Sequence, residues 1–299
     1  MHKPVLLNET VSALMISETP SIIIDATVNR GGHSKEILKK LAPKSTLICL
    51  DLDSTALIDA KKNLETIAKE RKVEIHYIQD NFRNVEEILT RLSIEKIDGI
   101  IADLGLSSEE LDSSERGFSF RFDEPLQMTL KDKVSDEDLT AKDVVNTWSL
   151  ETLTLILSSF SDEKYAYRIA SGVVKEREIK PITTTFELIE VIRKATPKAY
   201  HYGRTHFATK TFQAVRMAVN DELGALTTLI NSLPKILKPD ALAAIITFHS
   251  TEDRMVKHEV RKRENELSFV SKKAIMPEGS EIINNPRARS AQLRIIKKI

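Results

Sequence analysis

Residues 22–34 read Ile-Ile-Ile-Asp-Ala-Thr-Val-Asn-Arg-Gly-Gly-His-Ser, and this stretch decides the fold. The three isoleucines are β-branched and suit a strand that is buried on both faces. Gly31 and Gly32 remove side chains where the backbone must come close to another group. Residues 34–41 then place apolar side chains at helical intervals, so the pattern predicts a strand, a glycine turn and a helix. Folds built from this order hold nucleotide-like ligands at the carboxyl ends of their strands.

The glycine turn alone does not identify a ligand, because a Gly-Gly pair also occurs where a chain only needs room to reverse. The turn has neither the G-x-G-x-x-G spacing of dinucleotide-binding folds nor the Gly-Lys-Ser/Thr of a P-loop. Asn29 and Arg30 stand where a more glycine-rich loop is expected. A ligand site and a plain reversal both stay open at this point.

The alternation of strands and helices continues, and the next strands also end in polar or aromatic side chains. The strand at 47–53 ends in two acids, the strand at 74–80 leads to Phe82, and the following strand delivers Asp103. Asp51 lies about 20 residues past the glycines, where an acid accepts hydrogen bonds from a ribose diol. Phe82 is placed to pack against a purine, with a role in the core as the alternative. These strand ends predict a ligand site at one edge of a parallel sheet.

Residues 105–205 interrupt this pattern, since they contain no strand-like apolar run. They are predicted to form a loop followed by helices at 141–160, 162–177 and from Thr183 to near Pro197. A helix or helix pair at 208–237 then leads to a fifth strand at 241–249. Two short segments, at 269–270 and 291–296, complete the sheet.

The predicted fold class is therefore α/β: a Rossmann-like sheet with an inserted helical domain. We assign the sheet domain to residues 1–104 and 206–299, and the insertion to residues 105–205. Ser54 is expected to cap the helix that runs to about Arg71. An insertion of this size provides a surface beyond a cofactor pocket, which favours a methyltransferase acting on a macromolecule.

Composition places the chain among ordinary globular proteins. Its 299 residues are 41% hydrophobic and 29% charged. No apolar run approaches the roughly 20 residues of a membrane span, and the first residues lack the apolar core of a signal peptide. The single cysteine, Cys49, excludes an intramolecular disulfide, and no cluster has metal-ligand spacing. We therefore expect a cytoplasmic protein with no membrane association and no metal site.

The charge is balanced overall, with 44 basic and 44 acidic residues, so a nucleic acid must be held by a local patch. From Arg254 to the C-terminus, twelve Lys and Arg residues oppose five glutamates, a net charge of +7. The sequence predicts that this basic stretch is such a patch.

Several sequence blocks occur in a fixed order along the chain, and they lie at 2–7, 25–34, 98–108, 115–120, 208–216, 220–223, 248–254 and 285–290. Together they resemble the ribosomal small-subunit RNA methyltransferase H family, which is also described as MraW-like. Members of this family are S-adenosylmethionine-dependent enzymes that methylate the N4 atom of a cytosine in bacterial 16S ribosomal RNA. The resemblance implies a class I methyltransferase fold, S-adenosylmethionine as cofactor, and a target in the decoding region within the assembled or assembling small subunit.

The resemblance also implies the residues of the cofactor site, which are Gly31, Gly32, His33, Asp51, Phe82, Asp103 and Glu110. The family has a glutamine at the position of Glu110 and usually a glycine at the position of Asn29, so these two contacts stay open.

Methylation of an exocyclic amine needs help from the protein, because the nitrogen lone pair is delocalised into the ring. A hydrogen-bond acceptor near the amine can take up its proton. Asp103 is the first candidate, by analogy with acids at the fourth-strand tip of amino methyltransferases. His249, at the tip of the fifth strand, is the alternative; it is equally expected to orient Glu252 or a helix N-terminus.

A base in folded RNA must be splayed out to reach a buried methyl group, and aromatic and arginine side chains assist by stacking. Phe118, Phe120, Arg121 and Phe122 are placed for this, with packing of the insertion as the alternative for the phenylalanines. Arg287 and Arg289 are expected to contact phosphates.

Other classes stay open on the sequence alone. A small-molecule or protein methyltransferase of the same fold would not require the basic C-terminal stretch. A non-catalytic RNA-binding or assembly factor could retain the fold without turnover. A dehydrogenase is the weakest alternative, because the glycine turn lacks dinucleotide spacing. The oligomeric state is also open, with a homodimer among the alternatives.

Overall fold

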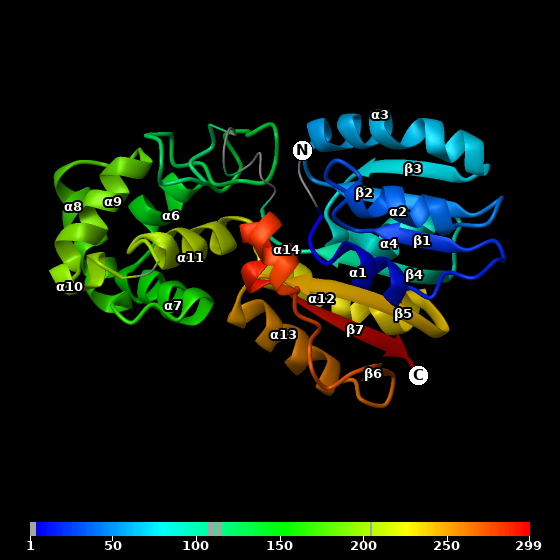
Figure 1. The fold of residues 1–299 in the computed structure, drawn as a ribbon. Coiled ribbons are helices and arrows are strands. Elements are labelled where there is room, and N and C mark those ends of the chain that lie inside the picture. The colour runs from blue at the N-terminus through cyan, green and yellow to red at the C-terminus, as the bar shows by residue number, and fades with distance from the viewer. Residues whose placement is uncertain (1–3, 107–110, 112–114, 204) are drawn as a thin grey trace. The chain divides into compact units, whose positions relative to one another are not determined.

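The computed structural model describes residues 4–106, 111, 115–203 and 205–299 (Figure 1). The chain forms two compact units. One combines Met1–Gly105 with Leu223–Ile299 and contains the sheet; the other, Leu106–Glu222, contains helices and loops. We call them the sheet unit and the helical unit.

Within the described residues, the sheet unit contains one seven-stranded sheet in the order β3-β2-β1-β4-β5-β7-β6. The strands β1 to β5 are parallel, and β7 is antiparallel to both β5 and β6. The strand order reverses between β1 and β4, which is where open α/β sheets bind ligands. The strands are β1 (Ile22–Asp25), β2 (Thr46–Asp51), β3 (Glu74–Gln79), β4 (Ile97–Asp103), β5 (Leu237–Thr247), β6 (Leu267–Phe269) and β7 (Gln292–Lys298). The predicted α/β sheet is confirmed.

Side chains alternate along the strands and fill a core on each face of the sheet. Ile24 and Ile48 pack in one core, whereas their neighbours Ile23 and Leu47 pack in the other. The first core includes residues of α4 (Val85–Arg91), α12 (Glu222–Ile236) and α13 (Ser250–Arg261); the second includes residues of α1 (Leu7–Ala13), α2 (Gly32–Lys40), α3 (Ser54–Arg71) and η2 (Pro286–Ser290). Two short helices, η1 (Phe82–Asn84) and α14 (Gly279–Asn284), complete the unit.

The cap of α3 differs from the prediction. Asp53, not Ser54, is the N-cap, and its carboxylate accepts a hydrogen bond from the backbone N–H of Thr55 at 2.8 Å. A carboxylate satisfies a free N–H at a helix start and also suits the positive end of the helix dipole. The helix ends at Arg71, as predicted.

The helical unit has a hydrophobic core of its own. Its helices are α6 (Ala141–Thr147), α7 (Leu150–Ser161), α8 (Ala166–Ile179), α9 (Thr185–Ala195), α10 (Lys198–His201) and α11 (Thr209–Val219). The capped start is confirmed at α9, where Thr184 and Glu187 form a reciprocal capping box. No helix of the described residues combines the length and apolar character needed to cross a membrane.

The single helix predicted over 141–160 is two helices, α6 and α7. Ser149 begins the second one, because its hydroxyl accepts a hydrogen bond from the N–H of Thr152 at 3.1 Å. Trp148 before it has extended backbone angles. A local cap therefore overrides a periodicity that runs through the break.

The unit boundary also differs from the one expected at residue 206. Residues 206–222 group with the helical unit, because α11 packs against α6 and α7 of that unit. Phe212 and Val215 of α11 belong to its core. The return to the sheet begins with α12.

Gly117→Ala is expected to lower the free energy of unfolding of the helical unit by about 1–3 kcal/mol. Gly117 has φ +77°, and an added Cβ would lie 2.4 Å from the carbonyl oxygen of Pro125, a backbone atom that cannot rotate away. Trp148, the only tryptophan, lies in this unit, so its fluorescence reports the unfolding.

Gly279→Ala is the matched control, since an added Cβ there meets nothing within 4 Å. Equal unfolding midpoints for the two variants would contradict the assigned strain at Gly117.

Candidate methyltransferase site

Three acids meet at the carboxyl edge of the sheet. Asp25, Asp51 and Asp103 are the last residues of β1, β2 and β4, three adjacent parallel strands. The sequence singled out Asp51 and Asp103 but gave Asp25 no role in the site. The structure places Asp25 between the strands that carry the other two.

The turn after β1 is held on both sides by hydrogen bonds. The hydroxyl oxygen of Thr27 accepts a hydrogen bond from the backbone N–H of Asp103 at 2.7 Å. On the other side, the N–H of Asn29 donates to a carboxylate oxygen of Asp51 at 2.8 Å. The turn therefore links the end of β2 to the end of β4.

The two glycines of the turn pack closely against the protein itself. An added Cβ on Gly31 would lie 2.9 Å from a methyl carbon of Leu64, and Gly31 has φ +79°. An added Cβ on Gly32 would lie 2.3 Å from Cγ of Pro4. The close approach predicted from the sequence is thus made to Leu64 and Pro4, and this packing fixes the path of the turn.

Burial raises the pKa of the three acids. Asp25 is almost fully buried, and its pKa is raised to about 6 even though the hydroxyl of Ser34 donates to it at 2.6 Å. Burial also raises the pKa of Asp51 to about 6. The pKa of Asp103 is raised to about 8, first by burial and then by the carboxylates of Asp25 and Glu252.

One carboxylate oxygen of Asp103 receives no hydrogen bond from the rest of the described structure. Its Oδ1 is buried and accepts no hydrogen bond from any described residue. Its Oδ2 lies 3.9 Å from Nδ1 of His33, whose Nε2 is 3.0 Å from the carbonyl oxygen of Val5. The carbonyl requires a proton on Nε2, so Nδ1 is the ring nitrogen that faces Asp103.

His249 acts as a helix cap. It is the N-cap of α13, and its Nδ1 accepts a hydrogen bond from the N–H of Glu252 at 3.3 Å. Its Nε2 lies 3.1 Å from Oε1 of Glu252, and Oε2 of that carboxylate accepts from the N–H of Phe248 at 2.8 Å. Nε2 is buried and makes no hydrogen bond within the described residues, whereas the Nδ1 contact matches the orienting role that the sequence left open. Glu252 is only 2% exposed; the sequence offered it as a partner of His249 but not as a buried neighbour of Asp103.

The other predicted cofactor residues lie in different surroundings. Phe82 begins η1 after β3 and is half-buried against the core that includes α4, so the core role left open for it is present. Glu110 lies outside the described residues.

The predicted RNA-contacting residues divide into buried and exposed side chains. Phe118 is 5% exposed and packs in the core of the helical unit, with the guanidinium of Arg116 at 5.3 Å from its ring centre. This burial supports the packing alternative and leaves no ring face for a base. Arg121 and Arg289 are exposed. Two further predicted residues, Phe120 and Arg287, are half-buried.

The positive charge of the C-terminal stretch is partly neutralised by two acids that precede it in the sequence. Arg294 and Lys257 pair with Asp253, and Lys297 pairs with Asp240. Three more of the twelve basic side chains, Lys262, Arg263 and Lys298, also form ion pairs. The net charge counted from the sequence therefore overstates the positive potential of this surface.

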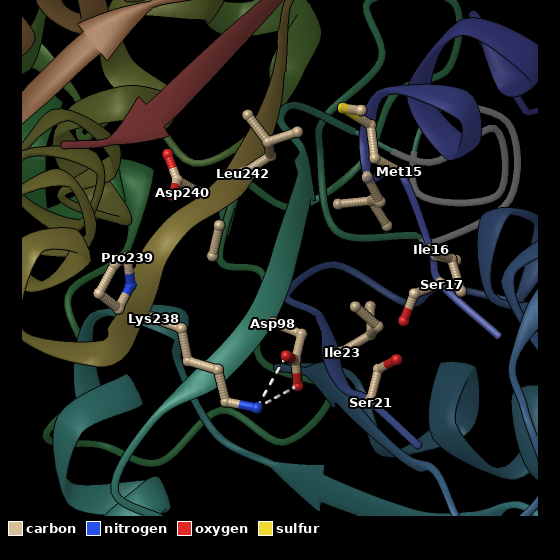
Figure 2. A pocket seen from close by; sticks show the side chains of 12 residues that line it. Met15, Ile16, Ser17, Ser21, Ile23, Asp98, Lys238, Pro239, Asp240 and Leu242 are labelled. Atoms are coloured by element: carbon tan, nitrogen blue, oxygen red, sulfur yellow. Dashed lines mark hydrogen bonds and ion pairs between the residues drawn. The ribbon is translucent and has the colours of Figure 1, made fainter. Parts of the chain in front are cut away.

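A cavity of about 280 Å³ lies at the opposite edge of the sheet (Figure 2). Its lining includes Asp98 near the start of β4 and Lys238 near the start of β5, which form an ion pair at 2.7 Å. Met15 and Ile16 lie across the cavity from this pair. Because the strands are parallel, this edge is remote from the acid-lined carboxyl edge.

The strand order, the glycine turn and the acids at the strand ends define a class I methyltransferase fold. The sequence profile of the MraW methylase family matches residues 1–299. Proteins named ribosomal RNA small subunit methyltransferase H from Clostridioides difficile (strain 630) and Acetivibrio thermocellus are 40% and 42% identical, over 100% of this chain and 99% of theirs. The relative of that name from Finegoldia magna is 41% identical over 98% of its length. The chain belongs to the MraW methylase family and is a methyltransferase, which sets the dehydrogenase alternative aside.

Proposed function

We propose that this protein methylates the N4 atom of a cytosine in the decoding region of 16S ribosomal RNA, with S-adenosylmethionine as the methyl donor. The full-length similarity to relatives named ribosomal RNA small subunit methyltransferase H supports an RNA substrate. The buried acceptor of Asp103 at the switch point is the observation that carries the chemistry. The assembled or assembling small subunit is the proposed partner.

The acids at the carboxyl edge fit a cationic ligand. Asp25, Asp51 and Asp103 form no ion pair with a lysine or arginine within the described part of the chain. S-adenosylmethionine carries a sulfonium and an ammonium group, which supply the missing positive charge. The ammonium group also supplies donors for the unsatisfied oxygen of Asp103.

The residues that hold the cofactor follow from their positions. Asp51 is proposed at the ribose hydroxyls, because its oxygens retain lone pairs beyond the two backbone N–H groups they accept. The turn of Gly31, Gly32 and His33 is proposed to face the cofactor through its backbone. Phe82 is proposed beside the adenine, and Glu110 near the methionine end.

The bound cofactor supplies an electrophilic methyl group, and the protein positions the cytosine amine and takes up its proton. We assign the proton to Asp103, whose raised pKa brings it into the range of a general base near neutral pH. His249 is the weaker candidate, because its Nδ1 caps α13 and its Nε2, which makes no hydrogen bond in the described structure, lies 3.1 Å from the carboxylate of Glu252. Positioning of donor and acceptor in line supplies much of the remaining rate.

Methyl transfer from labelled S-adenosylmethionine to small-subunit RNA tests the proposal. The RNA is offered naked and as assembled subunits, and the product nucleosides are identified by mass. N4-methylcytidine is the expected product. A control RNA with uridine at the target position should accept no label there, and cofactor binding without any methylated nucleoside would overturn the proposal.

Binding of S-adenosylmethionine is expected to release protons between pH 6 and 8. The pKa values of Asp25 and Asp51 are raised to about 6 and that of Asp103 to about 8, and a cation beside them favours the ionised forms. The affinity for the cofactor should therefore rise as the pH rises through this range. Calorimetric titration at pH 7 in phosphate and in Tris measures the release as a difference in apparent binding enthalpy.

Asp103→Asn is the control for this titration, since it cannot release a proton and should bring the two enthalpies closer together. Identical enthalpies in both buffers for the unmodified protein would contradict the linkage.

A further inference from the structure

The helical unit contains a positively charged segment at residues 191–220. Residues 191–220 contain six Lys and Arg residues and no Asp or Glu, in a chain whose charges otherwise balance. The same segment contains four Tyr and Phe residues and two histidines. Basic and aromatic residues interleaved in this way are typical of surfaces that bind single-stranded nucleic acid.

The cations of this segment lie in different surroundings in the structure. Arg216 is structural, because its guanidinium donates two hydrogen bonds to Glu222 at 2.7 and 2.8 Å and is largely buried. Lys194 is exposed and has only a long contact, 3.8 Å, to Glu176. Lys198, at the start of α10, is exposed and forms no ion pair with any residue that the structure describes. Lys194 and Lys198 are therefore available to a phosphate.

Two exposed rings lie just after these cations in the sequence. Tyr202 follows α10 and is 87% exposed. His206 is exposed too, and its ring stacks on Phe120 with centres 4.4 Å apart and planes 9° apart. Phe212 contacts the edge of Phe120, so a buried ring supports the stack from within the unit.

His206 lies between two neighbouring rings, in surroundings that do not favour a charge on it. Partial burial, and then the guanidinium of Arg193, lower the pKa of His206 below its usual value. The neutral ring also contacts the buried Phe207 at 4.4 Å. His206 is therefore held in the packing of the helical unit and has no open face for a base.

We propose that Lys194, Lys198 and Tyr202, at and beside α10, form an RNA-contacting surface, in which the ring of Tyr202 stacks on an unpaired base and the two lysines contact phosphates. This inference rests on the proposed RNA substrate and adds the surface that holds it. The same surface chemistry also fits an acidic protein, which the experiments below distinguish.

Tyr202→Ala should weaken binding of the full-length protein to a naked small-subunit RNA transcript by about tenfold, the usual loss for one stacked base. Tyr202→Phe keeps the ring and should restore the affinity. Phe186→Ala is the matched control, because Phe186 is an exposed aromatic of the same unit that lies beside Glu187 and accepts no base in this proposal. Binding is measured by fluorescence anisotropy or filter retention.

The double variant Lys194→Ala with Lys198→Ala should reduce the slope of log affinity against log salt by about 1.5 for two lost phosphate contacts. Lys61→Ala with Lys62→Ala removes the same charge from the exposed face of α3 and should leave the slope unchanged. An unchanged slope in the first variant would overturn the assignment of the two lysines.

The results of these experiments can reject the RNA-contacting surface and the proposed methylation independently of each other. Unmodified protein that binds RNA but yields no methylated nucleoside would reject only the proposed reaction. Variants that bind and methylate naked RNA as well as the unmodified protein would reject only the surface. Normal binding to naked RNA with weakened binding to assembled subunits would assign the surface to a ribosomal protein, and it would overturn the RNA contact.

Discussion

Asp103→Asn is expected to lower kcat for methyl transfer by on the order of 100-fold or more, the usual contribution of a general base. The substitution keeps the shape of the side chain and removes its ability to take up the proton of the amine. Steady-state kinetics on small-subunit RNA with saturating S-adenosylmethionine measures the loss.

A measurement of the variant's stability distinguishes this loss of activity from misfolding. The folded protein raises the pKa of Asp103 to about 8, so ionisation of this group destabilises the fold as the pH rises from about 4 to 8. An uncharged asparagine avoids that cost, and the variant should unfold at an equal or higher temperature at pH 8.

Asp98→Asn is the matched control for Asp103→Asn, because Asp98 lies near the other end of the same strand and pairs with the half-exposed Lys238. It should keep its activity. Full activity in Asp103→Asn would transfer the proton role to His249, and the corresponding test is His249→Ala with Glu252 left intact.

Asp253→Ala is expected to destabilise the sheet unit by about 3–5 kcal/mol, because it leaves a charged guanidinium buried without its partner. Arg294 and Asp253 are 7% and 5% exposed, and Nε of Arg294 donates to Asp253 at 2.5 Å. The pair joins α13 to β7. Burial raises the pKa of Asp253, but hydrogen bonds from Arg294 and Lys257 outweigh it and lower the pKa overall. The stability that the pair contributes is present at neutral pH and is lost as the pH falls below about 4.

Thermal unfolding followed by circular dichroism measures this effect. Replacing both partners with leucine should recover much of the loss, since no unpaired charge stays buried. Asp240→Ala removes the ion-pair partner of Lys297, which lies on β7 like Arg294. Asp240 is 79% exposed, so a loss of stability of only about 0–1 kcal/mol is expected. A loss for Asp253→Ala no larger than that of Asp240→Ala would contradict the assigned role of the buried pair.

The sequence predicted the strands and the acids at their ends well, because apolar runs, glycine turns and caps are local signals. It offered Glu252 only as a partner of His249 and did not predict its burial, which depends on how α13 docks beside β5. For the same reason it left Phe118 open between the core and an RNA contact. An aromatic residue in a loop carries no local signal of its exposure.

The net charge of the C-terminal stretch, counted from the sequence, overstated its positive potential for a related reason. The acids that neutralise Arg294 and Lys297 are Asp253 and Asp240, which precede the basic stretch in the sequence and meet it only in the folded sheet. The acid-free segment 191–220 was visible in the sequence, but its exposed rings and cations emerge only from the packing of the helical unit.

The pairing of β4 with β5 has a consequence for synthesis of the chain. Ile97 pairs with Leu237, so the two strands meet only after the whole helical unit has been made. At about 5–20 residues per second, the intervening chain takes roughly 7–30 s to emerge. During that interval the side of β4 that later pairs with β5 has no partner strand. An apolar strand edge of this kind is prone to non-native pairing. The helical unit has its own core and can fold in the meantime. Its folding shortens the flexible chain between β4 and β5 before β5 is made and so lowers the entropic cost of closing that loop.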